Sequence, residues 1–166
     1  MDTREYFWYA CYGSNLLRER FLCYIQGGQP EGSNKNYPGC LDKTLPIDEE
    51  DFFMVNELYF AKESKTWDRH GVAFIKNQFE EDVSTYGRMY LITKEQFIDV
   101  IIQENNFPKD IIINFDEAIR EGELIVSEKG FYNKILFLGY QYNKPIFTFT
   151  NSVDIYDYNK PKDDYI

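Results

Sequence analysis

The stretch YACYGSNL, residues 9–16, constrains the fold most, because a strand pattern gives way to a helix pattern within three residues. Aromatic and small apolar residues fill positions 6–12, a composition typical of a buried strand. Gly13, Ser14 and Asn15 interrupt that run, and apolar positions at helical spacing follow them. The sequence therefore predicts a strand, a tight turn and a helix in direct succession.

The rest of the chain favours an α+β fold. At 166 residues, with 43% hydrophobic and 18% aromatic residues, residues 1–166 form a single domain that can bury a sizeable core. Strand patterns outnumber helix patterns and do not alternate with them, which indicates a mixed or antiparallel sheet rather than a doubly wound one. The expected strands are 54–62, 71–77 and 85–93, with a hairpin within 130–150. The expected helices are 16–25, capped by Ser14 or Asn15, and one that starts after Thr93 with a capping box to Gln96.

Charge and cysteine content exclude several classes of partner. The net charge of −10 argues against nucleic acid and anionic membranes, since both repel an acidic surface. Three cysteines, an odd number, and no signal peptide indicate reduced thiols in a cytosol. The single histidine, His70, and the absence of a C-x-x-C spacing argue against a zinc site. The acidic residues 48–51 are interpreted as a solvated loop.

The turn at residues 13–15 has the chemistry of an anion cradle. Glycine permits a positive φ and close approach of a ligand to the backbone. Successive backbone N–H groups at a strand-to-helix turn can hold a carboxylate or a phosphate, and the helix N-terminus adds partial positive charge. The alternative is an ordinary capped turn, which is common. The phosphate-loop pattern G-x-x-x-x-G-K-[ST] is absent.

Glu104 is the second unusual residue. Helical spacing places it on the same face as the apolar residues Phe97, Val100 and Ile101. A carboxylate at the end of a buried stripe is costly, and desolvation raises its pKa toward the range that a general base needs. The alternative is a solvent-facing helix end without a function.

These residues together resemble a known family. The segment YACYGSNLLRERF is similar to the N-terminal signature of the γ-glutamylcyclotransferase-like superfamily, in which Tyr-Gly-Ser-Asn follows a strand and precedes a helix. The similarity extends in order over 64–75, over 86–105 with its helix-borne glutamate, over 146–151, and to a Pro-x-x-x-Tyr tail ending at Tyr165. The resemblance implies a small mixed, partly open β-barrel flanked by helices.

The resemblance also implies a reaction. The α-amine of a γ-glutamyl compound attacks its own γ-carbonyl, which yields 5-oxoproline and a free amine or amino acid. In this implied mechanism Glu104 is the catalytic base. The implied substrate-binding residues are Tyr12, Gly13, Ser14, Asn15 and Tyr165. No metal or cofactor is needed, because nucleophile and electrophile belong to one molecule that the enzyme chiefly orients.

Three features depart from the family pattern. The family has glycine just after its glutamate, where this chain has Asn105. Cys11 takes the place of an alanine, which favours a structural role for it. The resemblance also implies a further helix beyond Ile166, so we interpret the chain as a short member or a piece that lacks this helix. An uncovered sheet face would favour a homo-oligomer.

Two other functions remain open. The first is a small-molecule-binding module that keeps the cradle but has no turnover. The second is hydrolysis or acyl transfer with Ser14 or Cys11 as nucleophile, although no Ser-His-Asp or Cys-His arrangement is recognisable along the chain. The enzyme hypothesis predicts that Glu104 and residues 12–15 line one pocket. It also predicts that His70 and the three cysteines are dispensable for turnover.

Overall fold

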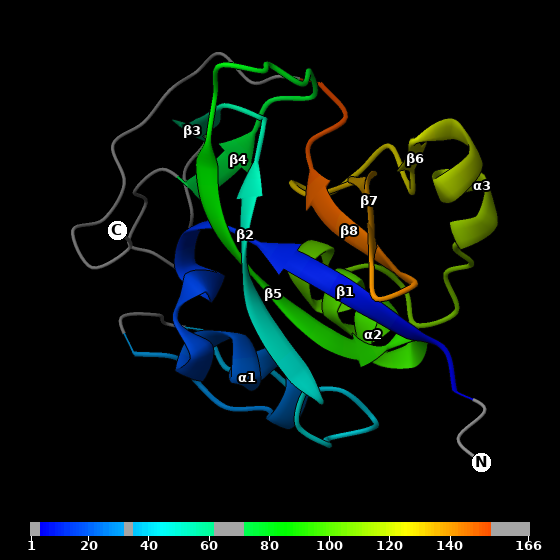
Figure 1. Ribbon diagram of the computed structural model, residues 1–166. Coiled ribbons are helices and arrows are strands. Elements are labelled where there is room, and N and C mark those ends of the chain that lie inside the picture. The colour runs from blue at the N-terminus through cyan, green and yellow to red at the C-terminus, as the bar shows by residue number, and fades with distance from the viewer. Residues whose placement is uncertain (1–3, 32–34, 62–71, 154–166) are drawn as a thin grey trace.

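The structure is a computed structural model that describes residues 4–31, 35–61 and 72–153 (Figure 1). His70 and Tyr165 lie outside the described residues, as do most of the segment 64–75 and the whole tail segment that contributed to the resemblance. For Ser14 and Asn15 the backbone alone is described.

Six strands form one mixed sheet, in the order β2-β5-β1-β8-β7-β6. Strand β1 lies near its centre, antiparallel to β5 and parallel to β8. Two further strands, β3 and β4, pair with each other in a small antiparallel sheet. The expected α+β fold with a mixed sheet is thereby confirmed. The strands are β1 (Tyr6–Cys11), β2 (Asp48–Met54), β3 (Leu58–Ala61), β4 (Val72–Ile75), β5 (Thr85–Thr93), β6 (Glu123–Ile125), β7 (Lys134–Gln141) and β8 (Lys144–Thr150).

The helices are a 3-10 turn η1 (Gly13–Leu16), α1 (Arg18–Gln26), α2 (Lys94–Asn105) and α3 (Phe115–Glu121). The predicted capping box is confirmed, because the Thr93 side chain accepts from the Gln96 backbone and the Gln96 side chain accepts from Thr93. The predicted cap of the first helix is wrong. Its N-cap is Leu17, which makes no side-chain capping bond, because η1 takes up the residues between strand and helix.

The central strand β1 is buried on both faces. Phe7, Tyr9 and Cys11 point into a large cluster shared with the helices, which lie against this face of the sheet; α2 lies behind β1 in the view of Figure 1. Trp8 and Ala10 point into a second cluster on the other face. Successive side chains of β1 point to opposite faces, and both faces are buried. Residues 6–11 therefore form an almost unbroken apolar run.

The described strands do not close into a barrel, because β2 and β6 end the sheet order without pairing with each other. The sheet is nevertheless curled around Trp8. Its indole Nε1 donates to the carbonyl of Gln141, 3.0 Å away at the end of β7. The Gln141 side chain in turn donates to Glu50 of β2 at 3.4 Å. Side chains rather than a backbone ladder therefore connect the two arms of the sheet.

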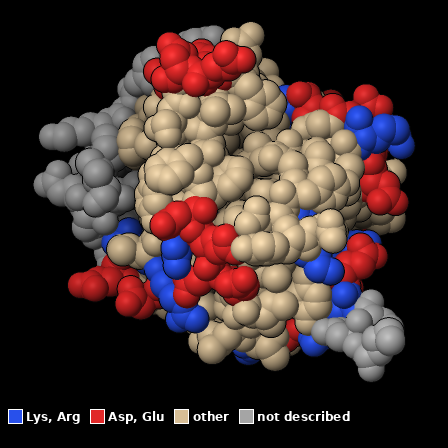
Figure 2. All heavy atoms as spheres, viewed as in Figure 1, with Lys and Arg blue, Asp and Glu red and all other residues tan. Residues whose placement is uncertain are grey.

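The acidic residues 48–51 form a strand, so their interpretation as a solvated loop is wrong. They begin β2, which pairs with β5 from Asp48 opposite Leu91 onward. Arg88 of β5 lies 3.3 Å from Glu49 and 2.7 Å from Asp51, which offsets the repulsion between these carboxylates. Figure 2 shows acidic and basic side chains next to each other on the face that carries β2.

Candidate functional site

The end of β1 forms the predicted strand-to-helix turn. Cys11 is the last residue of the strand, and the backbone of Gly13 then has a positive φ of 74°. That conformation suits glycine and supports the sequence argument for this position. The Tyr12 hydroxyl donates to the carbonyl of Phe149 in β8 at 2.5 Å, which fixes the turn between the central strands.

Glu104 is the penultimate residue of α2, and its side chain is half-buried. The three residues expected to share its face, Phe97, Val100 and Ile101, are almost completely buried, which confirms the apolar stripe. Glu104 therefore lies where the stripe meets the surface rather than deep in the core.

Electrostatic effects place the Glu104 carboxylate near two buried groups. Burial is the main cause of the raised pKa of Cys11, and the charge of Glu104 raises this pKa further. Burial also raises the pKa of Tyr24 on α1, and again Glu104 adds to the effect. Such effects decay with distance, so they agree with a Glu104 carboxylate on the side of the molecule where β1 ends. That Glu104 and residues 12–15 line one pocket stays a prediction.

Two buried phenols lie on the α1 side of this region. Tyr24 donates to the hydroxyl of Tyr37 at 3.2 Å, and their ring centroids are 4.4 Å apart. Tyr37 belongs to the loop after α1, which folds back through paired backbone bonds with Gly28. Sequence reasoning missed this pair, because nothing in the Gly-rich segment 26–40 indicates that Tyr37 packs on Tyr24 of the preceding helix.

The residues on either side of Glu104 carry side-chain amides, which form hydrogen bonds with backbone groups of other segments. Gln103 donates to the carbonyl of Tyr24 at 2.8 Å and accepts from the N–H of Gly39 at 3.0 Å. Asn105 donates to the carbonyl of Tyr132 at 2.9 Å and accepts from its N–H at 2.8 Å. The local sequence around Glu104 is thereby attached to three segments of the chain.

Cys11 is unsuited to nucleophilic attack. Its side chain is only 1% exposed, and its thiol donates to the carbonyl of Arg88 at 3.0 Å. The raised pKa keeps the thiol protonated near neutral pH, whereas a nucleophilic cysteine needs the thiolate. Cys11, Cys23 and Cys40 are all free thiols. Within the described ranges no three His, Cys, Asp or Glu side chains gather in a way that would hold a metal ion.

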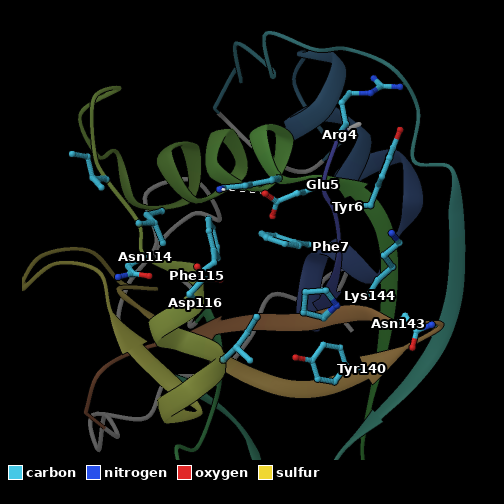
Figure 3. A pocket seen from close by; sticks show the side chains of 15 residues that line it. Arg4, Glu5, Tyr6, Phe7, Asn114, Phe115, Asp116, Tyr140, Asn143 and Lys144 are labelled. Carbon is cyan, nitrogen blue, oxygen red and sulfur yellow. Dashed lines mark ion pairs between the residues drawn. The ribbon is translucent and has the colours of Figure 1, made fainter. Parts of the chain in front are cut away.

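A hollow of about 610 Å³ lies at the opposite end of β1 (Figure 3). The segment 4–7, the start of α2, the region of α3 and the β7–β8 hairpin surround it. Lys94 pairs with Glu5 across 4.0 Å at its edge. Of the predicted site residues that the structure describes, none lines this hollow.

Comparison with known proteins identifies the fold. No family model matches the sequence. A solved γ-glutamyl cyclotransferase superposes over 97% of this chain and 74% of its own, with a TM-score of 0.51 and 16% sequence identity. A human protein described as uncharacterized gives the same coverage and identity with a TM-score of 0.50. The chain therefore has the γ-glutamylcyclotransferase-like fold.

A curated relative adds a different context. Histone deacetylase 5 of Arabidopsis thaliana is 37% identical over 155 residues, which cover 86% of this chain and 23% of that protein. The chain thus spans less than a quarter of the length of this relative. In the described part of the chain, no helix is both long and apolar enough to cross a membrane.

Proposed function

We propose that this chain is a cyclotransferase that converts a γ-glutamyl amine or amino acid to 5-oxoproline and a free amine. The observation that carries the proposal is the electrostatic effect of Glu104 on Cys11: its charge adds to the raised pKa of this thiol, which directly precedes Tyr12 and Gly13 in the chain. In this proposal Glu104 supplies the base and the turn at Gly13 supplies the cradle; the positive φ of Gly13 and the fold of a γ-glutamyl cyclotransferase support it.

The proposed chemistry is a single intramolecular acyl transfer. The substrate's α-amine nitrogen forms a bond to its γ-carbonyl carbon while Glu104 accepts the amine proton. The bond between that carbon and the leaving nitrogen then breaks, and the leaving nitrogen takes the proton. Backbone N–H groups of residues 12–15 would bind the substrate carboxylate or stabilise the developing oxyanion. Orientation and proton transfer are the main contributions of the protein.

The direct test is release of 5-oxoproline from a panel of γ-glutamyl amino acids, peptides and amines. At least one compound should be turned over by the wild-type protein. A panel without any release, from protein that melts cooperatively, would contradict the proposed reaction.

Glu104→Gln tests the base itself. The amide is nearly isosteric and uncharged, so the fold and substrate binding should be kept. Turnover should fall by roughly 10²–10⁴-fold, the usual contribution of general base catalysis. The wild-type rate should rise with pH through one ionisation that the variant lacks. A folded Glu104→Gln protein with wild-type turnover would show that Glu104 is only a helix-end residue.

The relative named a histone deacetylase favours a second candidate, a non-catalytic small-molecule-binding module. A stretch similar to this chain makes up less than a quarter of that much longer protein. In this second candidate the chain keeps the cradle, binds a ligand there and does not convert it. Calorimetric titration of the same panel separates the two candidates, because binding without 5-oxoproline release supports the module.

A further inference from the structure

We propose that Gln103 and Asn105 are positioning residues that fix the Glu104 carboxylate from both sides, a role that rests on the proposed function. The chemistry requires a base held within a fraction of an ångström of its working position. The end of a helix is a poor place for such a group unless other contacts hold it.

The end of α2 lacks part of the hydrogen bonding within the helix that holds its middle. The last carbonyls of any helix lack partners within the helix, and helix ends open at little cost in free energy. Here α2 stops directly after Asn105, because Asn106 is left-handed with a φ of 56° and its N–H bonds back to Ile102. Glu104 is therefore in the turn most prone to fraying.

Gln103 attaches this turn to α1 and to the loop after it. Its side chain is 8% exposed, and both ends of its amide are used, one on Tyr24 and one on Gly39. The ammonium group of Lys35 also donates to the Gln103 carbonyl at 3.4 Å. These bonds hold the side of the helix that faces the buried phenols.

Asn105 attaches the same turn to the segment before β7. Its amide makes two bonds with the backbone of Tyr132, and the Tyr132 hydroxyl donates to Ala73 at 2.7 Å. Gly130 leaves the room that this contact requires, since a Cβ at that position would lie 2.5 Å from the Asn105 oxygen. Asn105 stands where the resemblance implies a glycine, and a glycine has no amide with which to make these bonds.

The two amides act on opposite sides of the helix. Successive residues of an α-helix are about 100° apart, so residues 103 and 105 point roughly 200° apart with residue 104 between them. Two attachments in such opposed directions restrain both rotation and tilt of the last turn. The backbone from which the Glu104 side chain extends is thereby fixed, which limits the positions that its carboxylate can take.

The test compares three nearly isosteric variants that remove hydrogen bonds from α2. Gln103→Met and Asn105→Leu lose the bonds beside Glu104. Gln96→Met is the matched control: Gln96 is 2% exposed on the same face of α2, and its amide donates to the carbonyls of Asp42 and Thr44 at 3.0 and 2.8 Å. It lies seven residues from Gln103, about 10 Å along the helix axis.

All three variants should melt at lower temperature than the wild type. We expect kcat to fall about 10–100-fold in Gln103→Met and Asn105→Leu, in line with the effect of a misplaced catalytic group, with KM within about threefold. Gln96→Met should keep kcat within about twofold. Equal losses of kcat in all three variants would overturn the proposal, because they would follow stability alone. Asn105→Gly provides a second variant should Asn105→Leu fail to fold.

The pH dependence gives a readout that a merely structural role leaves unchanged. Glu104 raises the pKa values of two described groups, Cys11 of β1 and Tyr24 of α1, and both stay protonated in the range where a carboxylate titrates. The ammonium group of Lys35 faces the same turn of α2 through its bond to the Gln103 carbonyl. The ionisation in the pH–rate profile should shift in Gln103→Met and Asn105→Leu and stay in place in Gln96→Met. Unshifted profiles in both site variants would contradict a positioning role.

A measurement without turnover separates the two proposals. Protein with ¹³C-labelled glutamate side chains reports the titration of Glu104, assigned by the signal missing in Glu104→Gln. If the wild type releases no 5-oxoproline, the proposed function fails and this titration alone decides the positioning role. A midpoint that moves in Gln103→Met and Asn105→Leu but not in Gln96→Met supports it, and identical titrations in all proteins overturn it.

Discussion

Cys11 lies one residue before the predicted substrate loop, yet its thiol belongs to the core. Its burial and its bond to the Arg88 carbonyl explain why the sequence places a small apolar side chain here. The thiol stays protonated at neutral pH because burial raises its pKa. Cys11→Ala should therefore keep the turnover of the wild type. Loss of turnover in a folded Cys11→Ala protein would revive a nucleophilic role for Cys11.

The stability of the protein at alkaline pH should depend on Cys11. Above about pH 9 the thiol of the unfolded chain releases its proton, whereas the folded protein retains it because burial raises the pKa of Cys11. The unfolded state then binds fewer protons, so stability falls as pH rises. From pH 9 to 11 the wild type should lose up to about 1.4 kcal/mol per pH unit more than Cys11→Ala. Urea unfolding at each pH measures the two slopes.

Cys23→Ala serves as the control for this comparison, because the Cys23 thiol is partly exposed on α1. It should change the alkaline slope much less than Cys11→Ala. Equal slopes in the wild type and Cys11→Ala would mean that the thiol ionises in the folded protein.

At the level of residues, the sequence predicted the position of Glu104 on its helix but not the hydrogen bonds that Gln103 and Asn105 form beside it. Helical spacing alone placed Glu104 at the end of the stripe formed by Phe97, Val100 and Ile101, because that geometry is local. The bond from Gln103 to Tyr24 joins residues 79 positions apart, and no local pattern specifies such a partner. The positive φ of Gly13 was also predictable, because it follows from the conformational freedom of glycine and needs no distant partner.

Among the elements, the β7–β8 hairpin has a turn in which Tyr142 does not suit the backbone conformation. Gln141 pairs with Lys144, and the two residues between them, Tyr142 and Asn143, have positive φ values of 50° and 62°. Asn-Gly is the preferred sequence for such a turn. The double variant Tyr142→Asn, Asn143→Gly should therefore be more stable by about 0.5–1 kcal/mol, because it relieves the cost of left-handed conformations at residues other than glycine. Urea unfolding checks this value.

Tyr140→Asn is the matched control on the same hairpin. Tyr140 is also exposed, but it lies in the strand and its ring packs on Phe137 at 5.2 Å. This substitution should destabilise the protein, because asparagine is disfavoured in strands. Stabilisation by the control, or none by the turn variant, would contradict the turn argument.

The elements that the sequence predicted well are those with local signals. The bounds of β5 were predicted, and α2 starts directly after Thr93 as expected, because a strand pattern ends there at a capping box. Strand β2 was missed, since its carboxylates are offset by Arg18 and Arg88 from elsewhere in the chain. Helix α3 was missed as well: it has seven residues, too short for a clear period.

For the molecule as a whole, the net charge of −10 predicts a dependence on salt. Like charges repel in the compact state, and raising ionic strength to 0.3 M shortens the screening length to well below 10 Å. The melting temperature should rise by a few degrees between about 0.02 and 0.3 M NaCl. The same scan near the isoelectric point should show little change. A melting temperature that falls with salt at pH 7 would mean that ion pairs such as Arg88–Asp51 outweigh the overall repulsion.

The position of β1 at the centre of the sheet has a consequence for how the protein is made. A ribosome releases β1 early, but its parallel neighbour β8 is the last strand along the described chain, and Trp8 finds its indole partner 133 residues later. Until β8 is made, β1 lacks one of its two neighbouring strands, and part of its apolar surface stays uncovered. Pairings of such long sequence separation form slowly and leave apolar surface exposed meanwhile. Nascent chains that stop before β8 should therefore be the ones that chaperones retain.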